Sequence, residues 1–116
     1  MRQGRNTEGE VIAEQKLRVG LIGANGSSDR WGSRAHVPAL MALDEIELIA
    51  VGTAHEETAR NAQQRTGSKL AFSDYRDLVS SSEVDLVVVS VRISLHHPMV
   101  MAALAAKKHV FCEWPL

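Results

Sequence analysis

The stretch LIGANGSSDRWGSRAH, residues 21–36, directly follows the first apolar run of the chain. A glycine-rich loop between a strand and a helix binds pyrophosphate, because glycines admit a close backbone approach and the helix start presents unpaired amides. Here the spacing departs from G-x-G-x-x-G: Asn25 stands at the second glycine, and about five extra residues precede the next helix. Glycine spacing alone leaves an ordinary turn and a lengthened cofactor loop equally open.

The position of this stretch after an apolar run, and its other residues, favour a lengthened cofactor loop. Asn tolerates positive φ better than most non-glycine residues, so Asn25 can hold a tight turn after Gly23. Ser27 and Ser28 add hydroxyl donors for phosphate oxygens, and Trp31 is placed to close the loop against a crevice. The sequence therefore predicts a phosphate-binding loop in this stretch.

Short apolar runs alternate with helical patterns along the chain, as in strands buried on both faces of a parallel sheet. The predicted strands are residues 17–23, 46–52, 69–72, 84–91 and 109–112, and the predicted helices are residues 35–40, 55–66, 75–81 and 98–108. Because the helices are right-handed crossovers, we expect an α/β fold: a doubly wound parallel sheet with strand order 3-2-1-4-5. Ligands bind such sheets where the order reverses, so residues 21–36 should face residues 90–97.

Local signals mark where the two middle helices begin and end. Thr53 and Glu56 have the S/T-x-x-E spacing of a capping box, which predicts that Thr53 accepts a hydrogen bond from the Glu56 amide. Gly67 is predicted to end that helix. Ser73 or Asp74 is predicted to cap the next one.

The last helix has a proline near its start and lysines near its end. Pro98 is predicted in its first turn, because the missing N–H of proline has no helical partner there in any case. Lys107 and Lys108 are predicted to interact with its terminal carbonyls.

Composition excludes several classes of function. The 13 basic and 14 acidic residues are mixed along the chain, so neither a nucleic acid nor a membrane surface is predicted as a partner. Cys112 is the single cysteine, which excludes an internal disulfide and suits a reducing, cytoplasmic compartment. Residues 1–16 lack the apolar core of a signal peptide, so we expect a flexible polar tail before one domain, residues 17–116.

The end of the second predicted strand bears on the choice of cofactor. NAD-binding proteins usually place an acid there, which binds the ribose 2′-hydroxyl, whereas this chain has Thr53. A small hydroxyl leaves room for a 2′-phosphate, and His55 and Arg60 are the nearest cations along the chain. A purely helix-capping role for Thr53 is equally open. NADP or NAD is therefore predicted, without a choice between them.

Two adjacent histidines, His96 and His97, precede Pro98. A metal site is not predicted, because adjacent side chains point apart and no third ligand follows at a suitable spacing. His96 is instead predicted to donate to a cofactor or substrate oxygen, with a plain helix-start residue as the alternative.

The chain closely resembles the amino-terminal domain of the Gfo/Idh/MocA oxidoreductases in four stretches: RVGLIG, AHVPAL, DYRDLVSSSEVDLVVVSV and HHPMVMAALAAKKHVFCEWPL. The last stretch is the most specific, since the family typically reads G-K-H-V and then E-K-P there. The resemblance covers residues 17–116 and implies an NAD(P)-binding Rossmann domain. In the family a larger substrate domain follows, and it is absent from these 116 residues.

The resemblance also implies roles for individual residues. The loop at 23–28 would hold pyrophosphate, Thr53 would lie by the adenosine ribose, and Glu113 would contact the nicotinamide ribose. Residues 90–92 would line the crevice, and His96 matches a recurring histidine. The predicted cofactor contacts are Gly23, Asn25, Gly26, Ser27, Ser28, Trp31, Thr53, Ser90, Arg92, His96 and Glu113.

Two departures from the family pattern bear on catalysis. The family lysine of E-K-P is replaced by Trp114, which supplies no ammonium and takes no proton, so no catalytic residue is assigned. The A-T-P stretch after strand 4 reads Ser90-Val91-Arg92. The lengthened loop with Trp31, and the E-W pair, resemble instead the galactose co-repressor subgroup, whose members bind NAD(P) and regulate a transcription factor.

Three hypotheses follow. The first is the dinucleotide-binding domain of an oxidoreductase acting on a sugar or polyol through the missing domain, with turnover left open by Trp114. The second is a non-catalytic NAD(P) sensor with a regulatory protein partner. The third is an inert remnant whose fifth strand is an exposed edge. A homo-oligomer is also left open.

Overall fold

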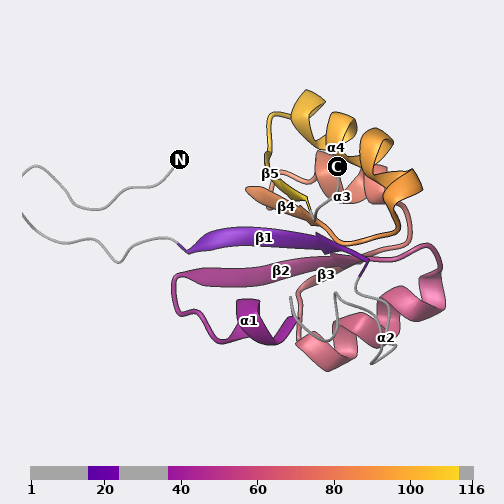
Figure 1. The fold of residues 1–116 in the computed structure, drawn as a ribbon. Helices are drawn as coiled ribbons and strands as arrows, with labels where there is room; N and C mark the ends of the chain where they lie inside the picture. The colour runs from indigo at the N-terminus through magenta and orange to yellow at the C-terminus, as the bar shows by residue number, and fades with distance from the viewer. Residues whose placement is uncertain (1–15, 24–36, 113–116) are drawn as a thin grey trace, which may run out of the picture.

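The computed structural model describes residues 16–23 and 37–112, which form one parallel sheet with helices on both faces (Figure 1). The strand order is β3-β2-β1-β4-β5, which confirms the predicted doubly wound arrangement. The elements are β1 (Leu17–Ile22), α1 (Val37–Met41), β2 (Ile46–Gly52), α2 (Glu56–Thr66), β3 (Leu70–Phe72), α3 (Tyr75–Ser80), β4 (Leu86–Val89), the 3-10 turn η2 (Ile93–Leu95), α4 (His96–Ala105) and β5 (His109–Cys112).

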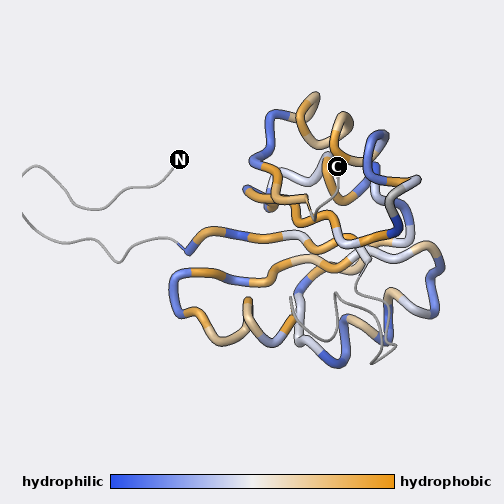
Figure 2. The backbone as a smooth tube through the Cα atoms, viewed as in Figure 1, coloured by the Kyte–Doolittle hydropathy of each residue, from blue (hydrophilic) through white to orange (hydrophobic). Residues whose placement is uncertain are grey.

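The three central strands form the core because their side chains are apolar on both faces. One face of β1, β2 and β4 packs with α1 and α2 through Leu21, Val51 and Val88. The other packs with α3 and α4, where Leu78 is fully buried. The inner strands carry the hydrophobic colour in Figure 2. Continuous apolar runs are therefore what hold the sheet between two helical layers.

The predicted capping box at the start of α2 is wrong. His55 is at the N-cap position without a side-chain cap, and the helix begins at Glu56. Thr53 stays in the extended chain because its amide donates to the carbonyl of Phe72, 3.1 Å away. Its hydroxyl contacts the His55 carbonyl and the Thr58 hydroxyl, each at 2.7 Å. Thr53 therefore stabilises the turn before α2 and does not cap a backbone amide of the helix.

Two other predicted helix signals are confirmed. Gly67 ends α2 with φ of 72°, and its N–H donates to the carbonyl of Gln63. Of the two candidates before α3, Asp74 is the cap, since its carboxylate accepts from the amide of Arg76 at 2.9 Å.

Pro98 lies in the first turn of the last helix, as predicted, although the bounds of the helix differ from the predicted ones. It begins at His96, two residues before Pro98, and it ends at Ala105. The terminal carbonyls of this helix accept hydrogen bonds from the backbone amides of Ala106, Lys107 and Lys108. Lys107 has a left-handed conformation (φ 63°). The predicted interaction of lysine side chains with these carbonyls is wrong for Lys108. Its Nζ donates instead to the carbonyls of Ser81 and Val84, each at 2.7 Å, because β5 runs beside β4.

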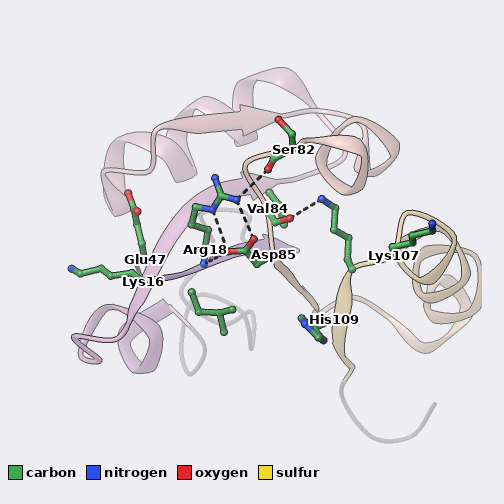
Figure 3. A pocket seen from close by; sticks show the side chains of 10 residues that line it. Lys16, Arg18, Glu47, Ser82, Val84, Asp85, Lys107 and His109 are labelled. Atoms are coloured by element: carbon green, nitrogen blue, oxygen red, sulfur yellow. Dashed lines mark hydrogen bonds and ion pairs between the residues drawn. The ribbon is translucent and has the colours of Figure 1, made fainter. Parts of the chain in front are cut away.

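An ion pair fastens the amino-terminal edge of the sheet (Figure 3). The guanidinium of Arg18 on β1 donates to both carboxylate oxygens of Asp85, which precedes β4, at 3.1 Å each. The Arg18 amide adds a third bond at 2.9 Å. These hydrogen bonds lower the pKa of Asp85 below its ordinary value. The pair lines a cavity of about 850 Å³, and Lys16 and Lys107 lie on opposite sides of this cavity. The pair thus ties the starts of the two central strands together.

We expect Asp85→Asn to lower the free energy of unfolding by about 1–2 kcal/mol at pH 7, because the charge-assisted bonds from Arg18 are lost. The folded-state pKa of Asp85 is depressed, so this stabilisation is present above the unfolded value near 3.8 and is lost as the pH falls below it. Urea unfolding at several pH values measures both effects.

The matched control is Glu56→Gln, which removes an exposed i,i+4 partner of Arg60. This control should change stability by less than about 0.5 kcal/mol. Equal losses in the two variants would contradict the role given to Asp85.

Candidate functional site

A cleft of about 540 Å³ lies at the carboxyl ends of the strands, opposite the edge that Arg18 and Asp85 fasten. It is lined by residues that follow β1, β2, β3 and β4, at the point where the strand order reverses. Backbone hydrogen bonds fix its floor. The amide of Gly23 donates to the carbonyl of Gly52 at 2.8 Å, and the amide of Ser90 donates to that of Ile22 at 2.9 Å. The predicted crevice and this cleft therefore coincide.

Gly23 brings the chain leaving β1 against the end of β4. Its φ is 103°, a conformation that residues with a side chain rarely adopt, and a Cβ there would collide with the carbonyl oxygen of Ser90. The cleft needs this contact, because any side chain would push the two strand ends apart. A dinucleotide fits such a place, since its pyrophosphate requires close backbone approach at the end of the first strand.

Thr53 lies at the end of β2, where its side chain is almost fully buried (8% exposed). Its hydroxyl, that of Thr58 and the carbonyl of His55 form a compact hydrogen-bonded group on the cleft wall. Among the described residues that line the cleft, Asp74, from the segment after β3, is the one with a carboxylate side chain. The end of β2 therefore presents hydroxyls and a neighbouring acid rather than an acid of its own.

The residues after β4 reach the cleft to different extents. Ser90 and the exposed Arg92 line it. His96 is buried (3% exposed), and its Nε2 lies 2.8 Å from the carbonyl oxygen of Val91. This hydrogen bond holds the turn that carries Arg92, whereas contact of His96 with a cofactor stays a prediction. Within residues 16–23 and 37–112, no cluster of three or more potential metal ligands is found.

One cation of the cleft wall was not identified from the sequence. Arg60 pairs with Glu56 on the exposed side of α2 and is not part of the lining. Arg76, from the start of α3, lines the cleft instead. The signal that could have found it is the strand order, because β3 ends beside β2 and so places residues 73–76 next to Thr53. The remaining predicted site residues lie outside the described parts of the chain: Asn25, Gly26, Ser27, Ser28, Trp31, Glu113 and Trp114.

We expect Gly23→Ala to destabilise the fold by about 3 kcal/mol or more, because both the backbone conformation and the Ser90 carbonyl exclude a methyl group. The matched control is Gly67→Ala, at a positive φ of 72° but with open space around it. This control should cost about 1–2 kcal/mol. Denaturant unfolding measures both, and a Gly23 variant no less stable than the Gly67 variant would refute the assigned contact.

Comparison with known proteins gives a consistent result. The model of the Gfo/Idh/MocA oxidoreductase family with an NAD-binding Rossmann fold matches residues 17–116. Myo-inositol 2-dehydrogenase from Thermotoga maritima is 34% identical, with 86% of this chain and 28% of that protein covered. A glycosyl hydrolase family 109 protein from Shewanella amazonensis is 50% identical over 97% of this chain and 26% of its own length.

Two further similarities concern the cofactor and the co-repressor resemblance. The crystal structure of the 3-ketoreductase KijD10 from Actinomadura kijaniata in complex with NADP superposes with a TM-score of 0.79 at 31% identity, covering 88% of this chain and 31% of that one. The galactose/lactose metabolism regulatory protein GAL80 of Saccharomyces cerevisiae is 28% identical over 97% of this chain and 28% of its own.

The chain thus spans less than a third of the length of these relatives. In the described residues no helix is long and apolar enough to cross a membrane. The family match covers the whole of the sheet and its helices. The chain belongs to the Gfo/Idh/MocA oxidoreductase family and forms its NAD(P)-binding Rossmann domain.

Proposed function

We propose that this domain binds a nicotinamide dinucleotide in the cleft at the carboxyl ends of β1 and β4, as part of an oxidoreductase acting on a sugar or polyol. The observation that carries the proposal is the contact of Gly23 with Ser90. Because Gly23 has no side chain, a pyrophosphate can approach the backbone closely at the switch point. The nicotinamide ring, when bound, supplies hydride transfer. The residues of this chain supply binding and orientation.

Different residues of the cleft would contact different parts of the dinucleotide. Arg92 is exposed on the cleft wall after β4, so its guanidinium can reach the pyrophosphate oxygens without being desolvated first. Thr53 stands where the adenosine ribose is expected. The rest of the proposed contact set consists of Gly23, Asn25, Gly26, Ser27, Ser28, Trp31, Ser90, His96 and Glu113.

The substrate class is inferred from the relatives. One is named for the oxidation of myo-inositol and another for the reduction of a 3-keto group, so a polyol or sugar hydroxyl is the shared chemistry. We place the substrate site mainly in a second domain, because residues 17–116 fill only the dinucleotide-binding part of these proteins.

A second candidate function is a dinucleotide sensor without turnover. Trp114, at the position of the family lysine, favours it, because an indole cannot transfer the proton that accompanies hydride transfer. The similarity to GAL80 supports it weakly at 28% identity. A sensor would need a protein partner that distinguishes the occupied domain from the empty one.

We expect NADP or NAD to protect the 116-residue chain against unfolding, by about 2.7 kcal/mol at a hundred times the Kd. Arg92→Gln should weaken binding of both dinucleotides about tenfold, because a cation on the pyrophosphate is lost. The control Arg60→Gln changes the same charge outside the cleft and should bind like the wild type. Thermal-shift titrations measure all three.

If the wild-type chain shows no shift at millimolar dinucleotide, the proposed function is wrong and the inert-remnant hypothesis gains support. Equal weakening by the two arginine variants would instead point to a general charge effect.

Enzyme and sensor are separated by Trp114→Lys in a two-domain protein that carries this domain. If the missing lysine alone prevents turnover, the substitution should raise NAD(P)-dependent oxidation of a polyol from background to a measurable rate. A reduced-nicotinamide absorbance assay follows this directly. A variant that binds the cofactor normally and still shows no rate would favour the sensor.

A further inference from the structure

The segment after β3 shares the adenosine side of the cleft with the end of β2. Gly52 and Phe72 are paired in the sheet, and the amide of Thr53 donates to the carbonyl of Phe72 at 3.1 Å. Residues 73–76 consequently line the same wall as Thr53 and Thr58. A ribose placed beside Thr53 therefore has residues 73–76 as close neighbours.

Arg76 presents a guanidinium on this wall that is accessible to a ligand. Its side chain is 73% exposed, so an anion can reach it with little further loss of water. Asp74 holds it in place: Nε donates to Oδ1 at 3.0 Å and Nη2 donates to Oδ2 at 2.8 Å. Two of its five N–H donors are used in this way, which leaves others for a second oxyanion. A planar donor fork of this kind suits phosphate oxygens.

Of the arginines and lysines in the described residues, Arg76 and Arg92 line the cleft, and His55 also lines it, next to Thr53. Arg60 is outside the lining and pairs with Glu56 at 3.2 Å. Arg92 follows β4, whereas Arg76 follows β3, which lies three positions from β4 in the sheet order. A dinucleotide lying across the strand ends would meet Arg92 near its centre and Arg76 at its adenosine end.

The end of β2 also lacks the group that excludes a 2′-phosphate. An acid there repels the phosphate and favours the ribose hydroxyl of NAD. Here the position is Thr53, whose hydroxyl lies 2.7 Å from that of Thr58. The acid on this wall, Asp74, is already neutralised by Arg76. The local charge is therefore balanced rather than negative.

We propose that Arg76 is the specificity-determining residue of the adenosine site and binds the 2′-phosphate, so that the domain selects NADP over NAD. The inference rests on the proposed dinucleotide function. Asp74 does not contact the phosphate: its carboxylate caps α3 and occupies two N–H donors of the Arg76 guanidinium. A 2′-phosphate accepts hydrogen bonds from the N–H groups of Arg76 that are not bonded to Asp74.

Separate titrations of the 116-residue chain with NADP and with NAD, followed by calorimetry, test this. Arg76→Gln should weaken NADP by about ten- to a hundredfold, because charge-assisted bonds to the phosphate are lost, and should leave NAD within about twofold. Arg76→Lys should recover part of the loss, since it restores charge without the donor fork. Arg60→Gln is the matched control and should alter neither affinity.

Asp74→Asn supplies a second readout. Asn retains the helix cap, so the fold should persist, while the loss of the carboxylate frees Arg76 and should raise the NADP to NAD affinity ratio several-fold. Thermal unfolding of each variant verifies that it is folded.

The outcomes separate the two proposals. If the wild type binds neither dinucleotide, the proposed function and this inference both fail. If it binds them and Arg76→Gln weakens both equally, or weakens neither, only the assignment of Arg76 is overturned.

Discussion

The contact between Gly23 and the carbonyl of Ser90 is the constraint on which the site depends. It exists because β1 and β4 lie side by side, while β2 lies on the other side of β1. The chain leaving β1 must pass directly over the end of β4, and only a residue without a side chain can do so at a φ of 103°. The cleft begins where the chain leaving β1 crosses the end of β4, because the segments that follow these strands lie apart from one another there.

The polar residues at the two ends of the strands, amino-terminal and carboxyl, have different roles. At the amino-terminal edge, Arg18, Asp85 and Lys108 make hydrogen bonds between neighbouring strands and loops, so their polar groups are spent on the fold. The larger cavity lies there, but its central charges are paired. At the carboxyl ends of the strands, Arg92 is exposed on the cleft wall, and Arg76 is 73% exposed there although it pairs with Asp74. Chemistry rather than volume therefore identifies the ligand site.

Most of the fold could be predicted from the sequence, because short runs of Leu, Ile and Val that glycine ends, such as residues 17–22 and 46–52, are typical of buried strands. Their alternation with helices favoured a doubly wound parallel sheet, and the structure confirms the expected strand order. Local spacing was a poorer guide where the sheet competed for the same residue. Thr53 has the spacing of a cap, yet its amide is held by Phe72.

The site could be predicted only in part. The end of β2 and the segment after β4 line the same cleft, as expected, because the switch point follows from the strand order. Arg76 was missed because its proximity to Thr53 comes from the pairing of β2 with β3, not from sequence distance. The burial of His96 against Val91 likewise depends on how the turn after β4 folds back.

Residue-resolved NMR of the 116-residue chain during titration with NADP tests the central claim most directly. Dinucleotide binding at the switch point predicts amide shift changes at Gly23, Thr53 and Ser90, with Arg18 and Asp85 unaffected. Changes confined to Arg18 and Asp85, or none at saturating NADP, would contradict it.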